Sequence, residues 1–114
     1  MPALNPDVGI VHAQRADRAG NVQLWGITGV HKEVVLASKR SLVTVEEIVD
    51  TLEPRPGAMV LPGWAVTVVA EVPGGAHPSY ALGYSDRDNE HYRAWDAISR
   101  DRDTFTEWLA GIRK

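Results

Sequence analysis

The segment Ala65–Val72 constrains the fold more than any other stretch of the chain, because four of its eight residues are valine. Valine is branched at Cβ and packs well on a pleated surface, so it favours strands over helices. The pairs Pro62–Gly63 and Pro73–Gly74 flank the segment, and both pairs interrupt regular structure. The pattern predicts a strand over Val66–Val72, buried at the centre of a sheet.

A second apolar run predicts another central buried strand over Val8–Ala13. Consecutive residues of this run are apolar, so both faces of such a strand would be apolar. Shorter β-rich runs predict three more strands, at Val22–Trp25, Ser41–Val43 and Ala58–Leu61. Between them, apolar side chains recur every three to four residues. This spacing predicts a helix over Val30–Arg40.

Local capping signals predict a further helix over Val45–Leu52. Thr44 and Glu47 have the spacing of a capping box, and Val43 and Ile48 have that of a hydrophobic staple. The proline-rich stretch that follows would end this helix, because proline cannot continue a helical hydrogen-bond ladder.

Helical spacing also predicts helices over residues 89–112, where aromatic and aliphatic side chains recur on two different faces. A break at Ser99–Asp101 separates them, with Asp101 or Asp103 as the N-cap of the second helix. Strands that alternate with helices, followed by a helical tail, predict an α/β fold. Because neither a linker nor a repeat is visible, we expect one domain over residues 1–114.

The composition excludes several classes of function. The 114 residues carry a formal net charge of -3, which disfavours a basic face for nucleic acid. Cysteine is absent, which rules out disulfides, thiolate metal sites and cysteine nucleophiles and fits a cytoplasmic protein. Apolar stretches such as Ala65–Ala70 are too short to span a bilayer, and no signal peptide is expected.

Motifs for common catalytic and metal sites are missing. No two of the four histidines have the spacing that places two ligands on one helix face, so we expect no metal site from His12, His31, His77 and His91. There is no GxGxxG or GKS/T phosphate loop and no GxSxG serine elbow. Neighbouring residues on a helix point about 100° apart, so Glu46 and Glu47 are expected to have structural roles.

One loop and one strand end remain as candidate sites. Gly74 and Gly75 lie between two prolines, and adjacent glycines let a backbone approach a ligand closely. The loop follows a strand, and α/β proteins bind ligands at the ends of strands. A plain strand-to-helix turn explains the same residues equally well. His12 and Gln14, at the end of the first strand, mark the second candidate.

Several stretches, taken in order, carry a family resemblance that covers nearly the whole chain. They are Ile10–Asp17 followed by Gly20–Asn21, Val43–Val49, Pro73–Pro78, and Tyr84–Asp88 with Trp95. These stretches resemble the A (alpha) subunit of family I CoA-transferases, the group of glutaconate and 3-oxoacid CoA-transferases. The resemblance is to the C-terminal half of that subunit only. It implies a three-layer α/β unit of the NagB/RpiA-like type, with a partial sheet, flanking helices and a helical C-terminus.

The resemblance implies transfer of CoA between carboxylic acids. In that family a glutamate of the B subunit is the nucleophile that attacks a CoA thioester, and it carries CoA as a glutamyl thioester. The present chain has no counterpart of this glutamate, so we assign it no catalytic residue. The resemblance places Gly74, Gly75, Ala76 and His77 near the substrate pocket, where backbone N–H groups could hold an acyl oxygen, with Gln14 as a weaker candidate. We expect this chain to bind no cofactor, since the coenzyme A thioester is a substrate.

Two alternatives remain open at this point. Some A and B pairs of this kind are CoA-thioester hydrolases that open rings in steroid degradation. The chain could also be a non-catalytic, truncated interaction domain, because Met1 directly precedes the first strand and the family's N-terminal half has no counterpart. The groups that separate transferase from hydrolase lie outside this chain.

Partners are expected for a chain of this kind: a B subunit, together with acyl-CoA and carboxylic acid substrates, but no nucleic acid and no membrane. Trp25 and Trp64 lie in glycine-flanked settings, and tryptophan is frequent at interfaces. Packing in the chain's own core explains them equally well. An uncovered sheet edge also favours association, so we expect an oligomer, either a homodimer or a complex with a B-type subunit. We expect no turnover from the chain alone.

Overall fold

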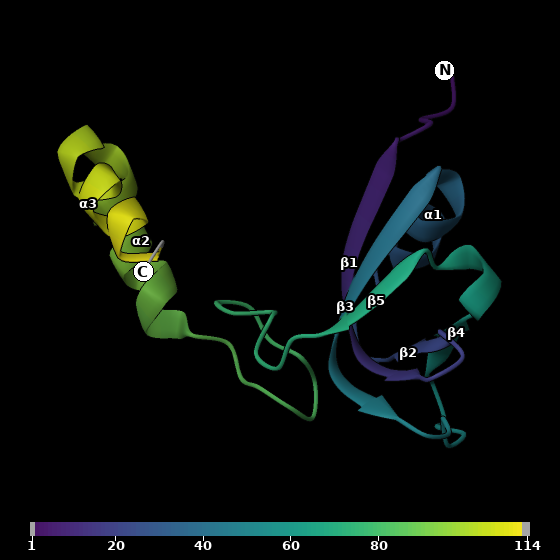
Figure 1. Cartoon of the computed structure of the whole chain (residues 1–114). Coiled ribbons are helices and arrows are strands. Elements are labelled where there is room, and N and C mark those ends of the chain that lie inside the picture. The colour runs from purple at the N-terminus through teal and green to yellow at the C-terminus, as the bar shows by residue number, and fades with distance from the viewer. Residues whose placement is uncertain (1, 113–114) are drawn as a thin grey trace.

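The structure is a computed structural model that describes residues 2–112, and its largest element is one mixed β-sheet. The strands are β1 (Val8–Asp17), β2 (Val22–Leu24), β3 (Arg40–Val49), β4 (Met59–Leu61) and β5 (Val68–Glu71). The helices are α1 (His31–Ala37), α2 (Asn89–Arg100) and α3 (Arg102–Ile112), and a short 3-10 turn covers Gly63–Ala65. In the sheet the strand order is β4-β2-β1-β3-β5 (Figure 1).

The central strand of the sheet is β1. It pairs in parallel with β3 and antiparallel with β2, while β5 extends the sheet in parallel from β3 and β4 extends it antiparallel from β2. The turn between β1 and β2 forms because the Asp17 carboxylate accepts hydrogen bonds from the backbone N–H groups of Ala19 and Asn21. Gly20 completes this turn at a φ of 84°, which favours glycine. The mixed sheet, with α1 on one face, and the helical hairpin of α2 and α3 confirm the predicted α/β class.

The strands β2 and β4 confirm the predictions at Val22–Trp25 and Ala58–Leu61. The helix α1 confirms the prediction over Val30–Arg40 but is shorter, because Ser38 takes an extended backbone and the chain enters β3 two residues later. The expectation of a single domain over residues 1–114 stays a prediction, and its ends at residues 1, 113 and 114 lie outside the described residues.

The hydrophobic core lies on the face of the sheet that α1 covers. Gly9 of β1 lies so close to α1 that an added Cβ would come within 2.9 Å of Val34 Cγ1. Side chains alternate between the two faces of a strand, so Val11 and Ala13 point to the same side as Gly9. The buried cluster consists of Val11, Ala13, Ala16, Val22, Leu24, Val35, Val43, Val45 and Leu61.

The predicted helix over Val45–Leu52 is wrong, because most of these residues belong to β3, which runs to Val49. Parallel pairing with β1 on one side and β5 on the other buries Val45 completely, which a short surface helix could not do. The predicted capping box does not form, and Glu47 instead pairs with Arg15. Tertiary packing of β-branched residues therefore overrides the local capping signal.

The position of β5 also differs from the prediction. The segment Val66–Val72 does contain a strand, but β5 lies at the edge of the sheet, and Val68 is 50% exposed. The segment Val8–Ala13 lies in the central strand as predicted, yet it is buried on one face only, because Ile10 is 66% exposed. An apolar run alone does not distinguish a strand that is buried on both faces from a strand that has one apolar face exposed.

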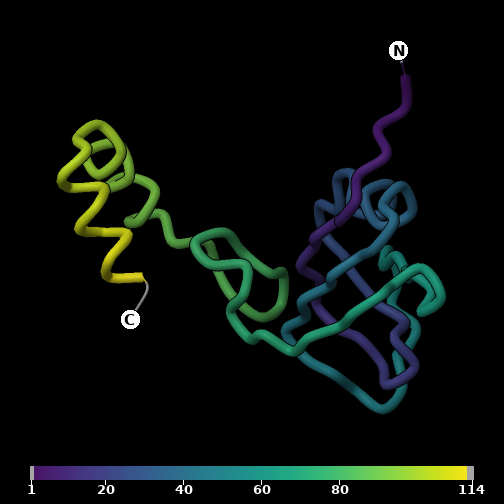
Figure 2. The backbone as a smooth tube through the Cα atoms, turned by 45° about the horizontal axis from the view of Figure 1, so that its top comes forward, coloured from purple at the N-terminus to yellow at the C-terminus, as the bar shows by residue number. Residues whose placement is uncertain are grey.

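The helices α2 and α3 lie apart from the sheet, at the far end of a long connecting segment (Figures 1 and 2). They pack on each other through aromatic rings, with 4.8 Å between the ring centroids of Trp95 and Trp108. The predicted break is confirmed, and its N-cap is Asp101, whose carboxylate accepts the backbone N–H of Thr104 at 2.8 Å. Asp103 lies inside the first turn of α3. None of the helices within residues 2–112 has the length and apolar character needed to cross a membrane.

The chain is more extended than a compact domain of its size. Its radius of gyration is 16.3 Å, whereas about 13 Å is typical for 114 residues. Its accessible surface is 8147 Å², against roughly 6,200 Å² for a compact monomer of this mass. The excess surface comes from the separate helical hairpin and from the uncovered face of the sheet.

Candidate functional site

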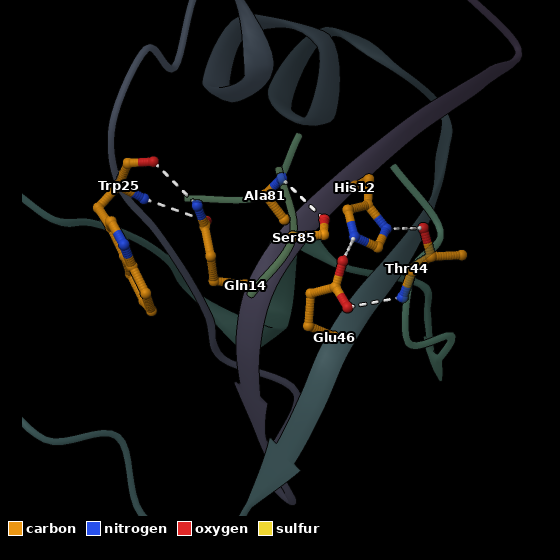
Figure 3. Close-up of polar contacts among 8 residues, drawn as sticks. His12, Gln14, Trp25, Thr44, Glu46, Ala81 and Ser85 are labelled. Atoms are coloured by element: carbon orange, nitrogen blue, oxygen red, sulfur yellow. Dashed lines mark hydrogen bonds and ion pairs between the residues drawn. The ribbon is translucent and has the colours of Figure 1, made fainter. Parts of the chain in front are cut away.

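A buried polar network joins β1, β3 and the loop that follows β5 (Figure 3). Glu46 on β3 is 7% exposed, and its Oε1 lies 2.9 Å from Nε2 of His12 on β1. Its Oε2 accepts a hydrogen bond of 2.7 Å from the backbone N–H of Gly74. The other ring nitrogen of His12, Nδ1, lies 2.8 Å from Oγ1 of Thr44. Both oxygens of this buried carboxylate therefore have partners, as the cost of burying a charge requires.

The register of two parallel strands builds this network. His12 pairs with Thr44 across β1 and β3, and side chains two residues apart point to the same face of a strand. Glu46 therefore lies beside His12, on the face opposite α1. The capping signal at Thr44 and Glu47 predicts a helix around Glu46, so this role of Glu46 was not among the predictions. The signal available in the sequence was the β-branched residues around Glu46, which favour a strand.

A cavity of about 200 Å³ lies next to this network. His12 and Gln14 contribute to its wall from β1, and Trp25 contributes from the residues after β2. The segment Ser79–Leu82, after the glycine loop, also lines the cavity. The cavity thus brings together His12 and Gln14, the strand-end residues that the sequence singled out.

The side chain of Gln14 is buried and hydrogen-bonded to the backbone of one residue, Trp25. Its Nε2 donates to the Trp25 carbonyl at 3.0 Å, and its Oε1 accepts the Trp25 N–H at 3.2 Å (Figure 3). The Trp25 indole N–H in turn donates to the carbonyl of Leu82 at 3.0 Å. Trp25 is only 7% exposed, so of the two explanations left open by the sequence, packing inside its own chain holds for Trp25, whereas Trp64 is 82% exposed.

The loop predicted to bind substrate lies against the His12 ring. Gly74 takes a φ of 74°, which favours glycine. A Cβ added to Gly75 would lie only 2.9 Å from Cε1 of His12. The backbone N–H groups of Gly75 and His77 donate to the carbonyls of Val72 and Gly74. The glycine pair is thus required by a turn and by close contact with His12.

The side chain of His77 points away from the His12 cavity. It lines a separate groove of about 580 Å³ together with His91, Trp95 and Trp108 of the helical hairpin. Its Nε2 lies 3.2 Å from Oδ2 of Asp88, the N-cap of α2. The hydrogen bond from the backbone N–H of His91, with a smaller effect from His77, holds the pKa of Asp88 below its usual value.

A second polar cluster fixes the end of the same connecting segment. Arg15 Nε donates to the Tyr84 hydroxyl at 2.6 Å and to Oε2 of Glu47 at 3.2 Å, and the Tyr84 hydroxyl donates to Glu47 at 2.8 Å. Burial, followed by the Glu47 hydrogen bond, raises the pKa of the Tyr84 phenol. The hydrogen bond to the Tyr84 hydroxyl raises the pKa of the Arg15 guanidinium above its usual value. Glu46 and Glu47 therefore hold the segment after β5 to the sheet at two points, Gly74 and Tyr84.

Within residues 2–112, no three His, Asp or Glu side chains converge in a way that could hold a metal ion. The polar chemistry of the site consists of the His12 imidazole, the hydrogen-bonded amide of Gln14 and the backbone of the segment after β5. These groups can form hydrogen bonds to an organic molecule bound in the cavity.

Comparison with known proteins identifies the family. A family model described as coenzyme A transferase matches residues 1–72 of this chain. This chain belongs to the coenzyme A transferase family. Its predicted resemblance to that family is thereby confirmed.

Members of the coenzyme A transferase family resemble nearly all of this chain. The A subunit of the 3-oxoadipate CoA-transferase of Pseudomonas knackmussii is 61% identical over 109 residues, which is 96% of this chain and 39% of the relative. The crystal structure of glutaconate coenzyme A-transferase from Acidaminococcus fermentans superimposes with a TM-score of 0.83 and 30% identity, over 96% of this chain and 35% of that one. The chain thus spans between a third and two fifths of the length of these relatives.

A weaker family relationship connects the chain to a hydrolase. The cholesterol ring-cleaving hydrolase IpdA subunit of Mycobacterium tuberculosis is 34% identical over 98 residues, which is 82% of this chain and 34% of the relative. The A subunit of the 3-oxoadipate CoA-transferase therefore has a higher sequence identity to this chain than the hydrolase subunit, over a longer aligned stretch.

Proposed function

We propose that this chain forms part of the A subunit of a CoA-transferase, which moves CoA between carboxylic acids together with a B subunit. The observation that supports this most strongly is the 61% identity to the A subunit of a 3-oxoadipate CoA-transferase. The identity to the ring-cleaving hydrolase subunit, 34%, supports the hydrolase alternative less well. A cytoplasmic location fits a chain without cysteine.

The proposed substrates are a CoA thioester and an acceptor of the 3-oxo dicarboxylic acid class. In the B subunit, a glutamate carboxylate attacks the thioester carbonyl, the CoA thiolate leaves, and an acyl anhydride forms. The thiolate then attacks the glutamyl carbonyl, which releases the donor acid and leaves a glutamyl thioester. The acceptor carboxylate passes through the same two steps in reverse. In this scheme Glu46 is not the nucleophile, because its two oxygens are held by His12 and Gly74.

Within this chain we assign substrate binding to Gln14 and to the backbone of the loop residues Gly74, Gly75, Ala76 and His77. The side chain of His77 lines the groove beside the helical hairpin and takes no part in this assignment. The support for this assignment is that Gln14 lines the cavity and that the loop backbone lies against His12 in its wall. Apolar surface from Leu24 and Trp25 together with the polar wall suits an acyl group with a polar end.

The decisive experiment measures CoA exchange with the chain alone and with the chain co-expressed with the remaining A-subunit part and the B subunit of a 3-oxoadipate CoA-transferase. We expect exchange from a donor acyl-CoA thioester to 3-oxoadipate in the complex and none from the chain alone. Turnover by the chain alone, after removal of contaminating enzymes, would contradict the proposal. The same complex, offered a ring-containing CoA thioester without an acceptor acid, tests the hydrolase alternative, because ring opening consumes water and moves no CoA.

A further inference from the structure

Glu46 is an unusual residue to find inside a small sheet, because a buried carboxylate is costly and seldom adds net stability. Its side chain is only 4% exposed, and His12 beside it is 17% exposed. Both carboxylate oxygens are engaged, one by the His12 ring and the other by the Gly74 N–H. One bond of this buried carboxylate goes to β1 and the other to the loop after β5, so Glu46 fixes the position of the loop relative to the strand.

With Glu46 ionised and His12 neutral, the hydrogen-bond chain runs in one direction. An ionised carboxylate only accepts hydrogen bonds, so Nε2 of His12 donates to Glu46. In the neutral ring Nδ1 then accepts the proton of the Thr44 hydroxyl, 2.8 Å away. Thr44 thus orients the ring, the ring orients the carboxylate, and the carboxylate holds the backbone of Gly74.

The same imidazole forms both a support for the loop and a wall of the cavity. On one side, Gly75 lies against Cε1 and Nδ1 of His12 without room for a side chain. On another side, His12 lines the cavity, and part of the cavity wall, Ser79–Leu82, is the continuation of the loop. A shift of the loop on the ring would therefore change the shape of the cavity.

We propose that His12 and Glu46 are positioning residues, which hold the loop Pro73–Ser79 against β1 and so set the shape of the cavity for a CoA thioester. The claim that the cavity takes a CoA thioester rests on the proposed function. The claim that His12 and Glu46 hold the loop rests only on the hydrogen-bond network. Neither residue exchanges atoms with the substrate.

The first experiment measures amide hydrogen exchange in the full chain, without any substrate. Glu46→Ala removes the acceptor of the Gly74 N–H, and we expect exchange across residues 74–79 to become about tenfold faster, as for loss of a hydrogen bond to a charged group. Glu46→Gln can accept from Gly74 with its amide oxygen and donate to Nε2 of His12 when the ring carries its proton on Nδ1 and donates to Thr44, so it should retain the wild-type rate. Thr44→Val, which keeps the shape of Thr44, should give a smaller acceleration and serves if Glu46→Ala does not fold.

The matched control is Glu47→Gln, a change in the neighbouring carboxylate that contacts Arg15 and Tyr84 instead of the loop. We expect it to leave exchange at residues 74–79 unchanged. If Glu46→Ala and Thr44→Val also leave this exchange unchanged, the positioning role is overturned, whatever the enzyme assay gives.

The second experiment compares KM and kcat of the assembled complex. Positioning predicts that Glu46→Ala raises KM for the CoA thioester about tenfold, and that Glu46→Gln restores it. If Glu46→Gln abolishes turnover while the loop stays protected, Glu46 takes part in the chemistry and the proposal is overturned. If the wild-type complex exchanges no CoA but the loop loosens in Glu46→Ala, the proposed function fails while the positioning of the loop stands.

Discussion

Gly75 shows at the scale of one residue how the loop depends on the strand beneath it. An added Cβ would lie 2.9 Å from both the His12 ring and the Val72 carbonyl oxygen, closer than packed atoms allow. We expect Gly75→Ala to lower the free energy of unfolding by about 1–3 kcal/mol, the usual range for overpacking. Urea-induced unfolding of the full chain measures this change.

The control for that substitution is Gly111→Ala. Nothing lies within 4 Å of a Cβ built on Gly111, in the last turn of α3. This variant should change stability by no more than about 0.5 kcal/mol. Equal unfolding curves for the two variants would mean that the loop does not rest on His12 in solution.

Asp17 gives the turn between β1 and β2 a dependence on pH. Hydrogen bonds from the side chain and backbone of Asn21, together with those from Ala19, hold the pKa of Asp17 below its usual value. A lowered pKa in the folded state means that this stabilisation is fully present above the ordinary carboxyl pKa of about 3.9 and is lost as pH falls through the folded value. Asp17→Asn should therefore be less stable than wild type at pH 7 and should approach it as pH falls below about 4.

The matched substitution for Asp17 is Asp50→Asn, which removes the same charge from an exposed carboxylate that pairs with Arg18. We expect it to change stability little at pH 7, because exposed ion pairs contribute little. Urea unfolding at several pH values compares the two variants. A gap between wild type and Asp17→Asn that stays constant down to pH 3 would contradict the prediction.

At the scale of an element, α3 depends on one of two neighbouring aspartates. Asp101 accepts both the backbone N–H and the hydroxyl of Thr104, whereas Asp103 lies inside the first turn. We expect Asp101→Ala to speed amide hydrogen exchange at Thr104 and Phe105, because a helix N-terminus without its cap frays. Asp103→Ala should leave these amides protected, and the reverse order would show that the cap lies at Asp103.

At the scale of the whole molecule, a row of apolar side chains crosses the sheet on the face opposite α1. Ile10, Leu42 and Val68 are neighbours across β1, β3 and β5, and two of them are at least half exposed. Apolar surface of this kind drives association, so the expectation of an oligomer stays a prediction. Sedimentation at micromolar concentration should show self-association that the double variant Ile10→Ser with Val68→Ser reduces.

The control for association is Trp64→Ser, which removes a large exposed side chain from the turn at Gly63–Ala65, outside the apolar row. If Trp64→Ser reduces self-association and the double variant does not, the interface lies at Trp64 instead. A monomer at every concentration for the wild-type chain would contradict the expected oligomer.

The sequence by itself determined the positions of most strands and helices and the family. β-Branched runs, glycine and proline breaks and the cap before α3 act between near neighbours, so the strands β1, β2, β4 and β5 and the α2–α3 hairpin could be predicted from local pattern. Local pattern also predicted the start of β3 correctly, as a strand at Ser41–Val43, but predicted a helix over Val45–Leu52, where β3 continues to Val49. That error arose because the capping signal at Thr44 and Glu47 is a weak local preference, while burial of Val43 and Val45 is a stronger tertiary one.

Only the tertiary structure decided the strand order and the network around Glu46. His12 and Glu46 are 34 residues apart, and they meet because β1 and β3 pair in parallel in one register. A shift of β3 by one residue would turn Glu46 toward the hydrophobic core and away from His12. The composition of each strand does not specify this register. The register is set by tertiary contacts, because α1 covers one face of the sheet and the loop after β5 contacts the other.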